Sequence, residues 1–219
     1  MKFTTKKLVT LAMLAAVAYI VSLFQVSVFP APMDFLKLEA KDSIIAMAGF
    51  FLDPLSAFFI SLVVSLIEMI TISTSGPIGA LMNTMSTCAF ACTAAFIYKR
   101  RHKLSGALIG LILGSIAMTV AMLLWNWLIT PLYQGWPRSV VEAALIPYFL
   151  PFNALKAGLN TALTMFLYKP LVNTLRKIGL LEKSSSSSAP GGSKLGFYLV
   201  AAAVLVSCIL GCLVLMGIL

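Results

Sequence analysis

The chain has 219 residues, of which 60% are hydrophobic and 11% are charged, and its mean hydropathy is +1.00. A soluble domain carries about 25% charged residues, and a single aqueous core of this size could not bury so much apolar surface. These values exclude a disordered chain and a secreted disulfide scaffold, and they predict an integral membrane protein. The net charge of +9 would also suit a nucleic-acid-binding protein, so its distribution along the chain decides its meaning.

Apolar runs along the chain predict seven helices. A membrane-spanning helix needs about 20 mostly apolar residues. The strands of a membrane barrel would alternate polar and apolar residues, and this sequence shows no such alternation. We therefore expect an all-α integral membrane protein, made of a six-helix bundle and an appended C-terminal seventh transmembrane helix. The expected helices are Leu8–Phe29, Ser43–Leu52, Leu55–Ile72, Ile78–Tyr98, Ala107–Ile129, Ala143–Lys169 and Leu195–Leu219.

The second run is too short to cross a membrane alone. It ends at Asp53-Pro54, where proline disfavours helix at the preceding residue and suits the first turn of a new helix. Asp53 is a suitable N-cap for that next helix. The short helix can form a hairpin with the following one, provided that neighbouring helices bury it.

The first run follows Lys2, Lys6 and Lys7, as the apolar part of a signal peptide does. That part has about 7–15 residues and ends at a small-residue cleavage site. Here the apolar residues continue past Ala16 to Phe29. This length favours a retained span over a cleaved peptide.

The basic residues predict the orientation in the membrane, because lysine and arginine concentrate in cytoplasmic loops. With the N-terminus in the cytoplasm, 12 of the 16 basic residues fall in cytoplasmic segments, and only Lys37, Lys41 and Arg138 fall outside. Lys156 lies within a span. The charge is therefore explained by topology and contact with anionic lipids, and no nucleic-acid partner is expected. The cytoplasmic set is Lys2, Lys6, Lys7, Lys99, Arg100, Arg101, Lys103, Lys169, Arg176, Lys177, Lys183 and Lys194.

The composition divides the chain into three parts. Residues 184–194 are rich in serine and glycine, which is typical of a flexible linker. They separate a six-helix membrane domain, 1–183, from the additional helix 195–219.

The sequence predicts neither a metal site nor an enzyme. The cysteines form two i, i+4 pairs, Cys88/Cys92 and Cys208/Cys212, whereas zinc sites favour closer spacing and histidine. We interpret them as small residues at helix contacts. The Walker A, HExxH and GxSxG motifs do not occur, so neither nucleotide hydrolysis nor protease chemistry is predicted.

Polar residues within the spans are the candidate ligand-binding groups, because they are costly in a membrane unless they are paired or face a cavity. Asn83, Asn126, Asn153 and Lys156 fall in the outer halves of their helices under the predicted topology. Asn153 and Lys156 are three positions apart and share a helix face, which Asn160 continues. Amides and an ammonium that converge in an apolar wall predict a pocket for a small ring system with polar edges.

Other interpretations of these residues stay open at this point. Asn126 lies between two tryptophans that could be interfacial anchors, and Asn83 could cap its helix or bond a neighbouring one. Lys156 could extend to the outer surface. Glu68, near the outer end of its helix, is assigned a structural role.

Small residues predict close helix contacts. Gly106, Gly110 and Gly114 repeat at i, i+4 and i+8, which permits close packing. Ala12 and Ala16 form a similar pair on the first helix. A lipid-facing alanine stripe there would suit docking by another helical protein.

Four stretches of the chain resemble the riboflavin-specific S component of energy-coupling factor (ECF) vitamin transporters. They are DFLKLEAKDSIIAMAGFFLDPLSAFF at 34–59, GPIGALMNTMST at 76–87, AMLLWNWLITPLY at 121–133 and PYFLPFNALKAGLNTALTMFLYKPL at 147–171. The Pro-Phe-Asn-x-x-Lys segment, Pro151–Lys156, is the most specific of these. Together they span nearly the whole six-helix body.

The resemblance implies a bacterial cell-membrane subunit that binds riboflavin from outside and has no catalysis or cofactor of its own, riboflavin being its cargo. It further implies that the loop after the first helix closes over the ligand, and that Ala12 and Ala16 dock a transmembrane T component. Two cytoplasmic ATPases would drive the complex. By position, the resemblance assigns riboflavin binding to Leu38, Glu39, Asn83, Asn126, Asn153 and Lys156.

The chain departs from the family pattern in two places. Related sequences often read Asp-Phe-Ser-Asp-Ile-Pro where this chain has EAKDSI at 39–44, and helix 195–219 has no counterpart in the six-helix body. Two alternatives are an S component for another vitamin or precursor, and an unrelated helical membrane protein such as an intramembrane enzyme. The candidate pocket residues Asn83, Asn126, Asn153 and Lys156 argue against an enzyme, because catalysis would need carboxylates, histidine or a metal.

Overall fold

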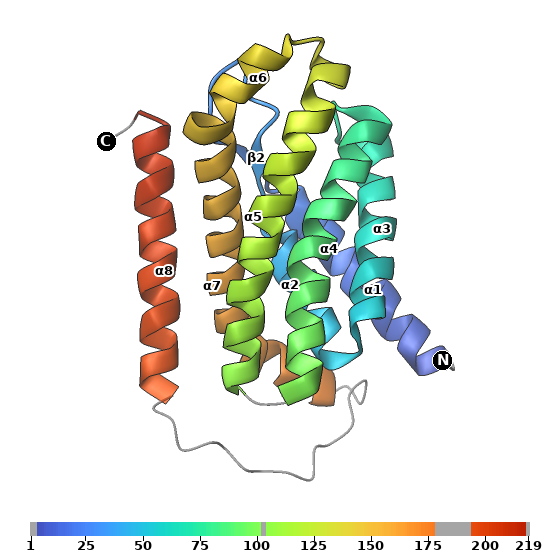
Figure 1. The fold of residues 1–219 in the computed structure, drawn as a ribbon. Helices are drawn as coiled ribbons and strands as arrows, with labels where there is room; N and C mark the ends of the chain where they lie inside the picture. The colour runs from blue at the N-terminus through green and yellow to red at the C-terminus, as the bar shows by residue number, and fades with distance from the viewer. Residues whose placement is uncertain (1–3, 102–103, 178–193, 218–219) are drawn as a thin grey trace.

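The computed structural model describes residues 4–101, 104–177 and 194–217, which form a helical bundle with a short two-stranded hairpin at one end (Figure 1). The elements are α1 (Thr5–Ser22), β1 (Val26–Ser27), β2 (Lys37–Leu38), α2 (Lys41–Phe51), α3 (Pro54–Thr71), α4 (Gly76–Arg101), α5 (Leu104–Gln134), α6 (Arg138–Ala144), the π-helix η1 (Leu145–Phe149), α7 (Leu150–Lys177) and α8 (Lys194–Leu215).

The helices confirm the predicted all-α membrane fold. Six helical segments among the described residues are long and apolar enough to cross a membrane. The helix predicted over 143–169 is α6, η1 and α7 in succession, and η1 contains Pro147, which has no backbone N–H to give to a helix. The predicted linker 184–194 lies, except for Lys194, outside the described residues.

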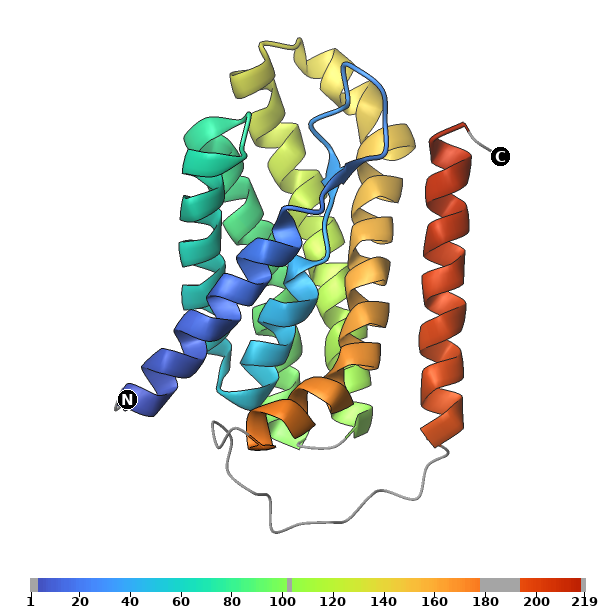
Figure 2. The same ribbon diagram turned by 180° about the vertical axis from the view of Figure 1, so that it is seen from behind.

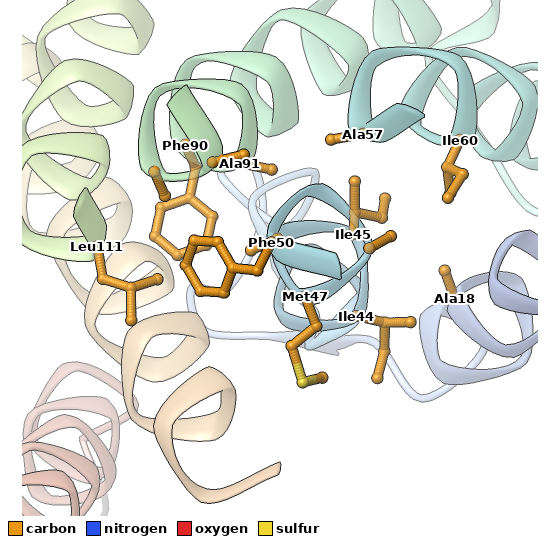
Figure 3. Packing of buried hydrophobic residues seen from close by; sticks show 14 of the residues in the cluster. Ala18, Ile44, Ile45, Met47, Phe50, Ala57, Ile60, Phe90, Ala91 and Leu111 are labelled. Carbon is orange, nitrogen blue, oxygen red and sulfur yellow. The ribbon is translucent and has the colours of Figure 1, made fainter. Parts of the chain in front are cut away.

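The short helix α2 occupies the centre of the bundle. Ten of its residues are buried, in agreement with the expectation that neighbouring helices cover it. Figure 3 shows Phe50 of this helix beside Phe90 of α4. In the same view Ile45 lies on the side of Ala57 of α3, and Ile44 lies on the side of Ala18 of α1. The burial of α2 places its first residues, and the loop before them, inside the membrane domain.

The predicted end of the first helix is wrong. The helix ends at Ser22, and Val26–Ser27 pairs antiparallel with Lys37–Leu38. Val28 and Phe29, which extended the apolar run in the sequence, lie outside the helix and pack in a second buried cluster with residues of α6, η1 and α7. Figure 2 shows the 23–40 segment lying over the hairpin end of the bundle.

The junction between α2 and α3 forms as predicted. Pro54 begins α3, and the Asp53 side chain accepts a hydrogen bond from the Ser56 N–H at 2.8 Å. Asp53 also pairs with Lys7 at 2.5 Å. The start of α1 is thereby tied to this turn, at the end of the bundle opposite the hairpin.

Helices α4 and α5 pack backbone to backbone. A Cβ atom on Gly110 would lie 2.6 Å from the carbonyl oxygen of Ala94, and one on Gly114 would lie 2.6 Å from that of Phe90. These two glycines confirm the close contact predicted from their spacing. At Gly106, near the start of α5, the neighbour is the Arg101 side chain at the end of α4.

We expect Gly110→Ala to destabilise the protein by on the order of 1–3 kcal/mol, because a backbone oxygen cannot move aside without separating α4 from α5. The measurement is thermal unfolding in detergent. Ile116→Ala, on an exposed part of the same helix, serves as the control and should leave the melting temperature nearly unchanged. Equal melting temperatures for the wild type and Gly110→Ala would contradict the close contact.

The additional helix α8 packs along α7 (Figure 1). A Cβ atom on Gly158 of α7 would lie 2.7 Å from Cys208 Sγ, and Gly211 of α8 lies against Leu155. Cys208 thus acts as a small contact residue, as predicted. Among the described cysteines none forms a disulfide.

Candidate functional site

A buried ion pair joins the loop before α2 to helix α7. Lys156 Nζ lies 2.9 Å from Glu39 Oε1 and 4.0 Å from Asp42 Oδ2. Lys156 is 4% exposed, so it does not extend to the outer surface. A buried charge is tolerated only when it is paired, and the loop supplies the partners.

A second buried pair adjoins the first and was missed by the sequence analysis. Lys41 Nζ lies 2.5 Å from Glu68 Oε2 and 3.1 Å from Glu39 Oε1. Lys41 was placed in an outer loop, but it begins α2 and is 1% exposed. Glu68, to which only a structural role was assigned, is 3% exposed and lines the pocket described below.

The ammonium groups keep Glu39 ionised. Burial alone would raise the pKa of Glu39, but the nearby charges of Lys156 and Lys41 outweigh it and lower the pKa from 4.5 to about 2. The carboxylate therefore stays charged at neutral pH. Its pairing stabilises the fold above pH 4.5, and this contribution is lost as the pH falls toward 2.

Asn160 fixes the loop against α7. Its Nδ2 donates to the carbonyl of Glu39 at 2.9 Å, and its Oδ1 accepts from the Ser43 N–H at 2.9 Å. One amide thus holds the backbone on both sides of Lys41. The face shared by Asn153, Lys156 and Asn160 serves both to line the pocket and to position the loop.

The polar residues predicted from sequence converge in one pocket at the hairpin end of the bundle. Glu39, Asn83, Asn126, Asn153 and Lys156 all line it, and its volume is about 110 Å³. Its other lining residues are Gln25, Phe35, Leu36, Lys37, Glu68, Ile72, Ser73, Thr74, Ser75, Gly79, Met82, Ser86, Met122, Tyr133 and Phe152.

Two of the helical amides are held by their own helices, and the third is held by a neighbouring helix. Asn126 and Asn153 each donate through Nδ2 at 2.7 Å to the carbonyl four residues earlier, Met122 and Phe149 respectively. Asn126 is 1% exposed, which excludes the alternative that it faces lipid headgroups. Asn83 donates to Glu68 Oε2 at 3.3 Å. These contacts fix the amides in orientations that can offer hydrogen bonds to a ligand.

Leu38 does not line the pocket. It lies in β2, is buried in the cluster formed by the hairpin and η1, and is flanked by Lys37 and Glu39, which do line the pocket. Its side chain therefore supports the loop, and its contact with a ligand stays a prediction.

Ala12 and Ala16 are both exposed on α1, far from the pocket. Ala12 lies in an apolar groove of about 510 Å³ between α1 and α3, lined also by Leu8, Leu11, Ala15, Phe59, Ile60 and Val63. Ala16 lies one turn further along α1, outside this groove.

Comparison with known proteins agrees with this architecture. Residues 6–168 match the family described as "ECF transporter, substrate-specific component". The chain is 28% identical to the riboflavin transporter RibU of Staphylococcus aureus over 182 residues, which cover 79% of this chain and 94% of that protein. It is also 28% identical to the riboflavin transporter FmnP of Bacillus subtilis over 183 residues, which cover 78% of this chain and 96% of that protein.

A solved structure has the same fold. It is described as "Structure and mechanism of the S component of a bacterial ECF transporter" and aligns with a TM-score of 0.67 at 27% identity, covering 78% of this chain and 98% of that chain. The family match contains every lining residue of the pocket and leaves α8 outside. The chain, a multi-pass membrane transport subunit, belongs to the family of ECF transporter substrate-specific components.

Proposed function

We propose that the chain is a riboflavin-binding S component that captures the vitamin in the pocket at the hairpin end. The observation that carries the proposal is the convergence of two ammonium groups, two carboxylates and four side-chain amides in a single pocket. Two relatives that align over nearly their whole length are named riboflavin transporters. The ring edge of a flavin alternates hydrogen-bond donors and acceptors, which side-chain amides can match.

The ligand contacts are assigned to Leu38, Glu39, Asn83, Asn126, Asn153 and Lys156. Pockets for drug-sized ligands have volumes of about 300–1,000 Å³, and the volume of this pocket is about 110 Å³. Riboflavin therefore requires the pocket to widen. We assign this widening to the 23–40 segment, which lies at the hairpin end (Figure 2) and has the β1–β2 pairing as its only regular secondary structure.

We infer the direction of transport from the distribution of charge. We assign the hairpin end to the outside and the N-terminus to the cytoplasm of a bacterial cell membrane, because Lys99, Arg100 and Arg101 lie at the opposite end of the bundle. Ligand would enter from outside. The subunit has no catalytic role and uses no cofactor, since riboflavin is cargo.

The energy for import would come from partner subunits. A T component would dock on α1 at Ala12 and Ala16, where small exposed side chains allow another helix to approach closely. Two cytoplasmic ATPases would complete the transporter. The apolar groove beside Ala12 supports this assignment.

The direct test is spectroscopic. The protein is purified in detergent, and its visible spectrum is recorded before and after denaturation, followed by titration with riboflavin while flavin fluorescence is monitored. A released flavin, or quenching that saturates at one flavin per chain, supports the proposal. A colourless protein that fails to quench riboflavin but binds another vitamin would favour an S component of different specificity.

We expect Asn153→Ala to weaken riboflavin binding about tenfold or more, because a lost buried hydrogen bond costs about 1–3 kcal/mol. The measurement is the same fluorescence titration. Asn173→Ala, at an exposed position of the same helix, is the control and should bind as the wild type does. Unchanged affinity in Asn153→Ala would remove this residue from the site.

A further inference from the structure

Glu68 lines the pocket, and one of its two carboxylate oxygens has no hydrogen-bond donor among the described residues. Its Oε2 accepts from Lys41 at 2.5 Å and from Asn83 at 3.3 Å. Its Oε1 is buried and accepts no hydrogen bond from the described residues. The Ser22 hydroxyl lies within hydrogen-bonding reach of the Glu68 carboxylate, and its hydrogen bond of 2.8 Å goes to the Tyr19 carbonyl.

A buried carboxylate oxygen without a donor is unfavourable, and native proteins contain few of them. The Lys41 ammonium contacts Oε2 of Glu68 and Oε1 of Glu39, and in the described part of the chain it donates no hydrogen bond to Glu68 Oε1. Glu68 lines the pocket and is 3% exposed. The missing donor can therefore come from a molecule that occupies the pocket.

The pocket has a polar side and an apolar side. Ser73, Thr74 and Ser75 line it from the α3–α4 turn, which lies between Glu68 and Asn83 in sequence, and Gln25 lines it from the loop after α1. Phe35, Met122, Tyr133 and Phe152 line it from the 23–40 segment, α5 and α7, and Phe35 packs edge-on against Tyr133 with ring centroids 5.9 Å apart. Riboflavin has two parts that match these sides: a flat, largely apolar ring system and a flexible chain of hydroxyl groups.

We propose that Glu68 Oε1 accepts a hydrogen bond from a hydroxyl group of the ligand's polyol chain, which lies along the polar side while the ring lies against the aromatic side. The inference rests on the proposed function, because it takes the ligand to be a flavin. Lys41 holds Glu68 in place through Oε2. Glu68 thereby distinguishes a flavin that carries hydroxyl groups from one that lacks them.

The test compares two flavins on two proteins. Riboflavin carries the polyol chain, and lumiflavin has the same ring with a methyl group in place of the chain. We expect Glu68→Gln to weaken riboflavin binding about tenfold to a hundredfold, since hydrogen bonds to charged groups are among the stronger ones. The affinity for lumiflavin should change less than twofold. Both are measured by flavin fluorescence quenching in detergent.

Asp42→Asn is the matched control, because it removes one buried carboxylate of the same ion cluster that does not line the pocket. Its effect should be equal for the two flavins, whatever its size. Glu68→Asp gives a second measurement. It keeps the charge but shortens the side chain by one methylene group, so it should weaken riboflavin binding more than lumiflavin binding. An equal effect of Glu68→Gln on both flavins, or none on either, overturns the inference. A wild-type protein that binds neither flavin contradicts the proposed function instead.

Discussion

Lys156→Met is expected to reduce the affinity for riboflavin by at least about a hundredfold and to lower the melting temperature of the ligand-free protein. The ammonium lies 2.9 Å from Glu39 Oε1 and 4.0 Å from Asp42 Oδ2, and all three side chains are buried. Removing one partner leaves uncompensated buried charge, which costs about 3–5 kcal/mol. Methionine keeps much of the length of the lysine side chain, so the losses of affinity and stability can be attributed to the missing positive charge.

The control is Lys99→Met, the same substitution at an exposed position, which should leave both affinity and melting temperature nearly unchanged. The double variant Lys156→Met/Glu39→Gln separates two roles of the pair. Neutralising both partners should restore much of the stability, because replacing a whole buried pair is often neutral. Binding should stay weak, because a ligand-contacting ammonium is still missing. Restored binding in the double variant would mean that Lys156 acts only by holding the loop.

The ligand pocket was predictable from sequence in part, because polar residues are conspicuous in apolar helices. Asn153 and Lys156 share a face through their spacing, and the structure brings both into the same pocket as Asn83 and Asn126. Their partners were not predictable in the same way. Glu39 meets Lys156 across 117 residues of sequence, and such a contact depends on how the loop folds over the bundle.

Glu68 and Lys41 show a signal that sequence analysis could have used. A glutamate within an apolar span is unfavourable without a cationic partner, so its presence predicts a buried lysine nearby. Lys41 was assigned to an outer loop because hydropathy places the start of α2 after it. The helix begins at Lys41 instead, and its central position buries the ammonium.

The end of α1 was misplaced for a related reason. Hydropathy measures how apolar a residue is, and an apolar side chain can be buried equally well in lipid or in the protein interior. Hydropathy alone therefore does not tell a membrane-spanning helix from a buried loop. Val28 and Phe29 continue the apolar run of the first helix, but they are buried in the hairpin cluster rather than in a helix. Val26 instead pairs with Leu38 in the hairpin, and this pairing depends on a segment 12 residues further along the chain rather than on the local sequence.

Ala12→Trp is expected to abolish riboflavin uptake by cells while leaving riboflavin binding by the purified protein within about twofold of the wild type. Ala12 is exposed in the groove between α1 and α3, which has a volume of about 510 Å³. An indole placed there would fill the space that a partner helix needs for close approach. None of the groove residues lines the ligand pocket. The variant should therefore still bind riboflavin but fail to transport it into the cell.

Ala203→Trp provides the matched control, because it makes the same substitution at an exposed alanine of α8. Helices α1 and α8 lie on opposite sides of the bundle (Figures 1 and 2), so a general effect of tryptophan on insertion or expression would appear in both variants. Uptake is measured with labelled riboflavin, and assembly by co-purification of the T component and the ATPases. Loss of binding together with uptake in Ala12→Trp would indicate misfolding, and normal uptake would exclude α1 as the docking surface. Loss of uptake in Ala203→Trp alone would instead assign docking to α8, the one described helix that lies outside the family match.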